Sequence, residues 1–140
     1  MPPALTPDLA LEYVHELSAD VRAGVVLDDA DERLAGPDRL AAPARALLRA
    51  GGEAAELEVA TADGVVCAVR SAGHRAVAVC GRFAIGGVVR QDLRAALAAL
   101  EGRPPDTAAP PPSAPPEAVD AALIAAADAL ISALQRGKSR

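Results

Sequence analysis

Apolar positions along residues 1–102 follow two spacings, one recurring every three to four residues and the other every second residue. The first spacing predicts helices at residues 7–18, 38–50 and 87–101. Short apolar runs and strict alternation predict strands at 23–27, 33–35, 55–61, 65–70 and 75–80. This order of elements predicts an α+β fold with a five-stranded, mostly antiparallel sheet between helices.

Two helices carry specific signals at their starts. Thr6-Pro7-Asp8 is typical of a helix N-terminus, and the apolar stripe that follows comprises Ala10, Tyr13, Val14 and Leu17. Within residues 38–50, Pro43 removes a backbone donor, so that helix either kinks or starts near Pro43.

The composition changes after Gly102. Residues 103–116 contain seven of the 12 prolines and are predicted to form an extended linker. Residues 117–135 are predicted to be helical. We therefore expect a domain at 1–102, a linker at 103–116, and an amphipathic helix with a basic tail at 117–140. The apolar stripe of this helix, which needs a surface to dock on, comprises Val119, Leu123, Leu130 and Leu134.

Charge and composition exclude several functions. The net charge of −5 and the scattered arginines argue against nucleic acid as a partner. No apolar run approaches the ~18 residues of a membrane span, and no secretion signal is visible, so we expect a cytoplasmic protein without membrane insertion. Cys67 and Cys80 lie in apolar runs, which favours buried free thiols close to each other on adjacent strands.

The glycine-rich segment from Gly81 to Val88 invites comparison with a phosphate-binding loop. Gly81 and Gly86 have the required spacing, but Gly87 and Val88 stand where that motif needs Lys and Ser or Thr. The glycines are better explained by tight backbone geometry between a strand and a helix. We therefore expect no nucleotide site here.

Other candidate sites are equally incomplete. The acidic run at residues 28–32 fails the calcium-loop pattern and is predicted to be a solvated turn. His15 and His74 lack neighbours in metal-ligand spacing, and no acid, base and nucleophile occur together. The sequence predicts neither metal, cofactor nor catalysis.

One family resemblance rests on two segments. Ala84-Ile-Gly-Gly-Val-Val-Arg-Gln-Asp-Leu-Arg-Ala-Ala-Leu97 resembles the glycine-then-apolar entry into the last helix of Roadblock domains, the dynein light chain type also found in bacterial GTPase modules. Ala23-Gly-Val-Val-Leu-Asp-Asp-Ala-Asp-Glu-Arg-Leu-Ala35 is similar to the first hairpin of that family. The resemblance covers roughly residues 7–101.

The resemblance implies a non-catalytic homodimer that binds a small Ras-like GTPase, as an activator or scaffold. It implies contacts between copies through residues 38–50 and 55–61. Glu56 and Glu58 would then approach their symmetry mates, and Arg45 and Arg49 are the residues that could neutralise these carboxylates. The implied interface residues are Leu40, Ala44, Arg45, Leu48, Arg49, Glu56 and Glu58. The C-terminal helix can dock on its own chain, on a second copy or on another protein, and we favour docking within the dimer.

A second class of function is a small-molecule sensor of the PAS or profilin-like α+β type. Such a sensor needs a pocket between the sheet and the helices, usually lined by aromatic residues. One Tyr, one Phe and no Trp make that alternative weaker.

Overall fold

The computed structural model of the chain describes residues 6–102 and 121–138. The helices are α1 (Pro7–Leu17), the 3₁₀ turn η1 (Asp38–Leu40), α2 (Ala41–Ala50), α3 (Gly86–Leu100) and α4 (Ala121–Lys138). The strands are β1 (Val21–Asp28), β2 (Arg33–Ala35), β3 (Glu56–Thr61), β4 (Gly64–Arg70) and β5 (His74–Cys80).

The five strands form one sheet in the order β2-β1-β5-β4-β3, and every neighbouring pair is antiparallel. This confirms the predicted α+β fold and its antiparallel sheet. The short strand β2 and the strand β3 therefore form the two edges of the sheet.

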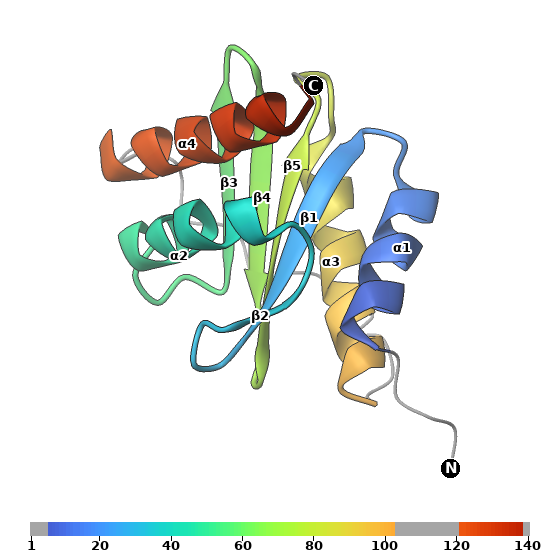
Figure 1. The fold of residues 1–140 in the computed structure, drawn as a ribbon. Coiled ribbons are helices and arrows are strands. Elements are labelled where there is room, and N and C mark those ends of the chain that lie inside the picture. Colours follow the sequence, from blue (N-terminus) through green and yellow to red (C-terminus); the bar gives the residue numbers. More distant parts are fainter. Residues whose placement is uncertain (1–5, 103–120, 139–140) are drawn as a thin grey trace.

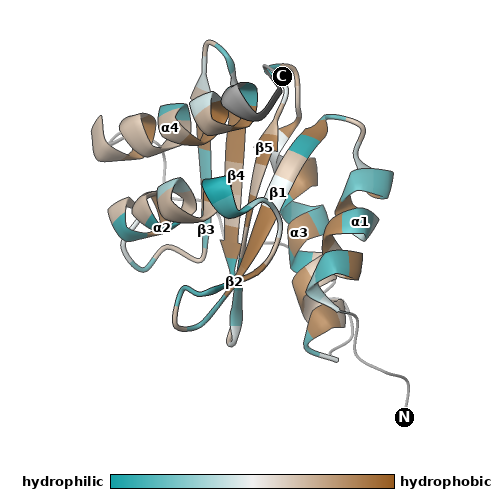
Figure 2. Ribbon diagram, viewed as in Figure 1, coloured by the Kyte–Doolittle hydropathy of each residue, from teal (hydrophilic) through white to brown (hydrophobic). Residues whose placement is uncertain are grey.

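Helices cover both faces of the sheet (Figure 1). α1 and α3 lie over one face, and α2 and α4 lie side by side over the other. Alternation along the strands directs side chains into two separate cores, so that in β4 Val66 joins the α2/α4 side while Cys67 joins the α1/α3 side. Figure 2 shows the hydrophobic residues concentrated on the strands between the two helical layers.

α1 begins as the sequence predicts, because the Thr6 hydroxyl accepts a hydrogen bond from the Leu9 amide at 3.2 Å. Its predicted apolar stripe is only partly buried. Val14 is 2% exposed, whereas Tyr13 is 41% and Leu17 48% exposed. Of the predicted stripe, only Ala10 and Val14 are buried in the core on the α1/α3 side. Tyr13 and Phe83, which is 80% exposed, are the two aromatic residues of the chain, and both lie at the surface.

Pro43 fits α2 without a kink in the middle of the helix. The α-helix begins at Ala41, after the 3₁₀ turn, so Pro43 stands in its first turn. Amides there have no intrahelical acceptor, and the missing donor costs little. Of the two alternatives drawn from the sequence, the late start is the one observed.

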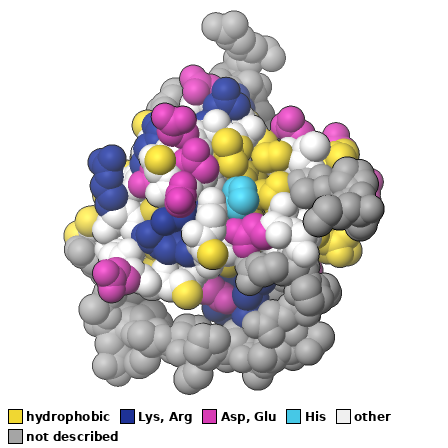
Figure 3. All heavy atoms as spheres, turned by 90° about the horizontal axis from the view of Figure 1, so that it is seen from below, with side chains coloured by type: hydrophobic (Ala, Val, Ile, Leu, Met, Phe, Trp, Pro, Cys, Tyr) yellow, Lys and Arg dark blue, Asp and Glu magenta, His cyan; other side chains and the backbone are white. Residues whose placement is uncertain are grey.

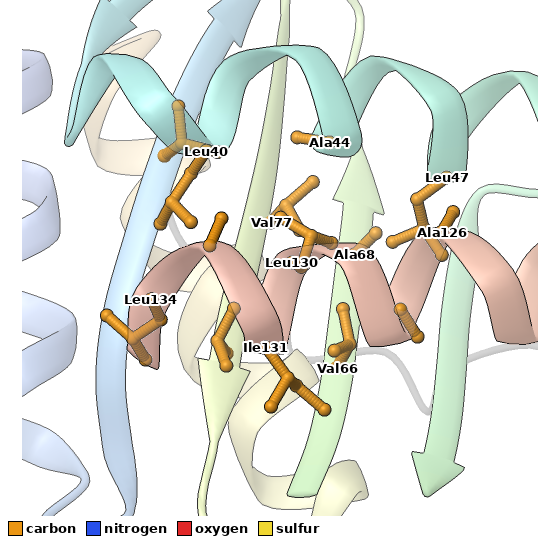
Figure 4. Packing of buried hydrophobic residues seen from close by; sticks show 14 of the residues in the cluster. Leu40, Ala44, Leu47, Val66, Ala68, Val77, Ala126, Leu130, Ile131 and Leu134 are labelled. Atoms are coloured by element: carbon orange, nitrogen blue, oxygen red, sulfur yellow. The ribbon is translucent and has the colours of Figure 1, made fainter. Parts of the chain in front are cut away.

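α4 packs on its own chain, antiparallel to α2. Figure 4 shows Leu130 and Ala126 of α4 on the side that faces Ala44 and Leu47 of α2, with the sheet residues Val77 and Ala68 beside Leu130. Leu123 is partly buried against the same core, and Leu134 is 6% exposed. The Arg39 guanidinium also donates to the Ala133 carbonyl at 3.1 Å. Val119, which the sequence assigned to the same stripe, lies outside the described residues.

We expect Leu130→Ala to lower the free energy of unfolding by about 2–5 kcal/mol, because Leu130 is fully buried between α4, α2 and the sheet. The matched control is Ile124→Ala on the same helix. Ile124 is 41% exposed, so its truncation should cost less than about 1 kcal/mol. Urea denaturation checks both; equal effects of the two variants would show that α4 does not dock in this way.

Candidate protein-interaction site

The outer edge of β3 offers unpaired backbone groups. On its inner side, the Arg70 amide donates to the Ala55 carbonyl at 2.8 Å, and antiparallel pairing with β4 continues from there to Thr61. In an antiparallel ladder only every second residue bonds to a given neighbour. The residues whose N–H and C=O groups point away from β4 are therefore Glu56, Glu58 and Ala60.

The two glutamates of this edge are neutralised by α3. Arg90 lies 3.1 Å from the Glu56 carboxylate and 3.3 Å from that of Glu58, and Arg94 lies 2.9 Å from Glu56. The Glu56 side chain is only 12% exposed. These carboxylates therefore do not present bare negative charge at the edge, which removes a common barrier to edge-to-edge pairing.

Within one chain, the arginines that the sequence proposed for this role do not pair with the glutamates, and Arg49 is exposed on α2. Arg45 donates to the Asp31 carbonyl at 2.6 Å, and the partners of the glutamates come from α3 instead of α2. The reason is the direction of the β3 side chains. Glu56 and Glu58 point to the α1/α3 side, whereas Leu57 and Val59 point to the α2/α4 side.

Three expected interface residues are core residues of the single chain. Leu40 and Ala44 are 0% exposed and Leu48 is 2% exposed, because α4 and the sheet cover that side of α2. They present no surface to a second copy while α4 is docked. The sequence could not show this, since the apolar stripes of two helices can bury each other or a partner equally well.

Gly86 explains part of the glycine-rich segment. An added Cβ at this position would lie 2.0 Å from a carboxylate oxygen of Glu58. Glycine therefore leaves the space that the Glu58 side chain occupies when it pairs with Arg90. The carbonyl of Gly86 also lies 3.9 Å from the Cys67 sulfur. Gly86 is therefore a close-approach position, whereas a Cβ at Gly81 or Gly87 would meet its nearest atom only at 3.6 or 3.8 Å. A carboxylate beside the loop is moreover unfavourable for phosphate.

The same segment exposes apolar side chains that the sequence analysis did not single out. Phe83 is 80%, Ile85 69% and Val88 48% exposed. The sequence did carry a signal for them: three large apolar residues stand around the glycines at the start of a helix, before the first large buried residue of that helix, Val89. Such clusters often mark interaction sites.

The acidic run is an ordered turn held by its own backbone. The Asp28 carboxylate accepts from the amides of Ala30 and Glu32 at 2.8 and 2.9 Å, and Asp31 pairs with Arg75 at 3.4 Å. Within residues 6–102 and 121–138, no group of His, Cys, Asp and Glu residues is arranged to hold a metal ion.

His74 belongs to a structural cluster at one end of the molecule. One oxygen of Glu101 contacts the His74 Nδ1 atom at 2.9 Å and accepts from the Ser71 hydroxyl at 2.7 Å and the Gly73 amide at 3.0 Å. The carboxylate lies between the serine and the histidine, so the imidazole cannot activate the hydroxyl as in a catalytic triad. Figure 3, which views the molecule from below, shows charges of both signs intermixed on this face.

Cys67 and Cys80 are free and buried, as the sequence predicts. A hydrogen bond with the Cys80 thiol, together with burial, raises the pKa of Cys67. The Cys67 thiol is therefore protonated at neutral pH and unreactive.

A groove of about 540 Å³ lies between α1, the start of β1 and the end of α4. Its lining includes Asp8, Glu12, His15, Arg22 and Arg39, so it is rich in charge of both signs. It lies beside the sheet, whereas a sensor domain would need a pocket between sheet and helices. In the described part of the chain, apolar side chains fill the space between the sheet and α1/α3 and the space between the sheet and α2/α4. The groove therefore does not favour the sensor alternative.

No described helix combines the length and the hydropathy that crossing a membrane requires.

Comparison with known proteins supports the fold. The structure matches two crystal structures of Roadblock/LC7 domains from Streptomyces avermitilis. One has a TM-score of 0.53 and 20% identity, over 63% of this chain and 91% of the other. The second has a TM-score of 0.58 and 15% identity, over 68% and 94%. No family model and no curated protein matches the sequence. The chain thus has the Roadblock/LC7 fold.

Gly86 and Gly87 offer a matched pair of substitutions. An added Cβ at Gly87 meets its nearest atom at 3.8 Å, so Gly87→Ala should raise stability by about 0.4–1 kcal/mol. Gly86→Ala displaces Glu58 and should be less stable than Gly87→Ala by about 1 kcal/mol. Denaturation in a Glu58→Ala background checks the cause, because the difference should disappear there. A difference that persists would show that Glu58 is not the reason for glycine at 86.

Asp92 on α3 provides a pH test. Burial raises the pKa of this carboxyl, and its Oδ2 atom has no hydrogen-bond partner among the described residues. A raised folded-state pKa means that ionised Asp92 destabilises the fold, and that this cost disappears as the pH falls through that pKa. Asp92→Asn should therefore raise the melting temperature at pH 7 by about 1–3 °C, but not at pH values below 3.8. The matched control is Asp128→Asn at an exposed position on α4, which should change the melting temperature at pH 7 by less than Asp92→Asn does.

Proposed function

We propose that this chain is a non-catalytic regulatory or scaffold protein that acts as a homodimer in the cytoplasm and binds a small GTPase of the Ras-like class. The Roadblock/LC7 fold carries the proposal, since the sequence resemblance to that family implies this function. The polar clusters of the described residues hold turns and loops in place, which is consistent with a protein that works by contact.

The free edge of β3 supports dimerisation. The backbone N–H and C=O groups that point outward from β3 belong to every second residue, namely Glu56, Glu58 and Ala60. The two glutamate side chains are paired with Arg90 and Arg94. Two copies can therefore align their β3 edges antiparallel without repulsion between like charges. Such pairing satisfies backbone groups on both copies and joins the two sheets.

Ala60→Pro tests this edge directly. Proline removes an N–H group that points away from β4, so it should spare the β3–β4 hairpin but interfere with pairing to a second copy. We expect the dimer to dissociate at least about tenfold more readily than with the control Ala60→Ser, which keeps the N–H group. Light scattering against concentration measures this, with circular dichroism to confirm the fold. A wild-type chain that stays at 14.1 kDa at high micromolar concentration would contradict the dimer.

The GTPase is tested separately. The full chain is titrated against the Ras-like GTPases encoded in the genome that encodes this protein. Each GTPase is loaded with GTP or with GDP, and binding is measured in a surface-based assay. We expect one of them to bind with a preference for one nucleotide state. Absence of binding to all of them would leave the dimer standing but overturn the GTPase assignment.

A further inference from the structure

The two most exposed large apolar side chains of the described residues lie in the connection between β5 and α3. Phe83 is 80% and Ile85 69% exposed, and Val88 follows at 48%. We call these three residues the 83–88 patch. The Arg82 guanidinium lies 4.9 Å from the centroid of the Phe83 ring and covers part of it. Elsewhere in the described chain, exposed large apolar residues reach at most 48%.

The patch adjoins the free edge of β3. Gly86 lies between Ile85 and Val88 in the chain, and it is so close to the Glu58 side chain that a Cβ would clash with the carboxylate at 2.0 Å. Arg90, one turn further along α3, pairs with both glutamates of β3. The patch and the edge are therefore parts of one continuous surface.

Edge pairing by itself would bury little apolar area. Leu57 and Val59 of β3 already pack on the α2/α4 side of their own chain, and the glutamates are paired with α3. Stable protein interfaces bury about 1,200–2,000 Å² in total. A six-residue strand edge cannot supply that area, so a dimer through β3 needs adjacent apolar side chains.

We propose that the 83–88 patch is the apolar part of the homodimer interface, where it packs against a second copy of this chain beside the joined β3 edges. This rests on the proposed function, which supplies the dimer through β3. Antiparallel pairing about a two-fold axis perpendicular to the sheet puts the α1/α3 layers of both copies on the same side. It thereby brings each copy's segment before α3 towards the axis.

Charge favours a second copy as the occupant. An interface between identical copies brings like groups together, which is unfavourable for unpaired charges of one sign. The carboxylates nearest the patch, on Glu56 and Glu58, are neutralised within their own chain. The three side chains of the patch are apolar and can pack on those of a second copy, and the Arg82 cation beside them lies over the Phe83 ring.

Disulfide trapping of Ile85→Cys tests the geometry. Cys67 and Cys80, the native cysteines, are buried and give no competing reaction at the surface. Under mild oxidation we expect Ile85→Cys to form a covalent dimer at low micromolar concentration. Leu34→Cys, an exposed apolar position on β2 at the opposite edge of the sheet, is the matched control and should form several-fold less. Equal yields from the two variants would overturn the proposal.

Phe83→Ser with Ile85→Ser then tests the energetics. The double variant should weaken the dimer by about tenfold or more, as for apolar residues central to interfaces, while Leu34→Ser should not. Melting curves confirm that each variant is folded.

The result separates the two proposals. If Ala60→Pro dissociates the dimer and the patch variants do not, the patch proposal is wrong and the β3 dimer stands. If the wild-type chain is monomeric, the dimer fails, and the patch proposal with it.

Discussion

Both faces of this sheet are apolar, and each has to be covered. The inner strands β1, β4 and β5 send valines, leucines and alanines alternately to the two sides, so that two separate cores form. On one side α1 and α3 cover the sheet. On the other side α2 has only ten residues, too few to cover five strands, and α4 completes the layer. The C-terminal helix is thus a structural part of the domain, although the chain reaches it only after residues 103–120.

Because α4 covers the surface beside α2, a partner protein has to contact other parts of the molecule. Leu40, Ala44 and Leu48 would otherwise form an apolar helix face suited to another protein. With α4 in place, most of the exposed large apolar residues in the described part of the chain lie on α1 and in the 83–88 patch, on the opposite side of the sheet; the others are Ile124 on α4 and Leu34 on β2. The added helix changes which surface is available without changing the Roadblock/LC7 fold.

The charge cluster between β3 and α3 links the strand edge to the glycine-rich segment. Glu56 and Glu58 reach across to Arg90 and Arg94, and Gly86 leaves space for one of these carboxylates. Of the glycines that resemble a phosphate loop in the sequence, Gly86 thus has a role in packing and electrostatics in the folded chain.

From the sequence alone we predict the element order, the antiparallel sheet, the burial of Cys67 and Cys80, and the absence of a complete phosphate-loop motif. These follow from local spacing and from residue types, which a linear pattern records. Tertiary packing selects Arg90 and Arg94 as the partners of Glu56 and Glu58, leaves Tyr13 and Leu17 exposed, and buries the apolar stripe of α2 under α4. Those outcomes depend on which faces meet across 30 or more residues of chain. An apolar stripe or a charged side chain has several energetically similar partners until packing selects one.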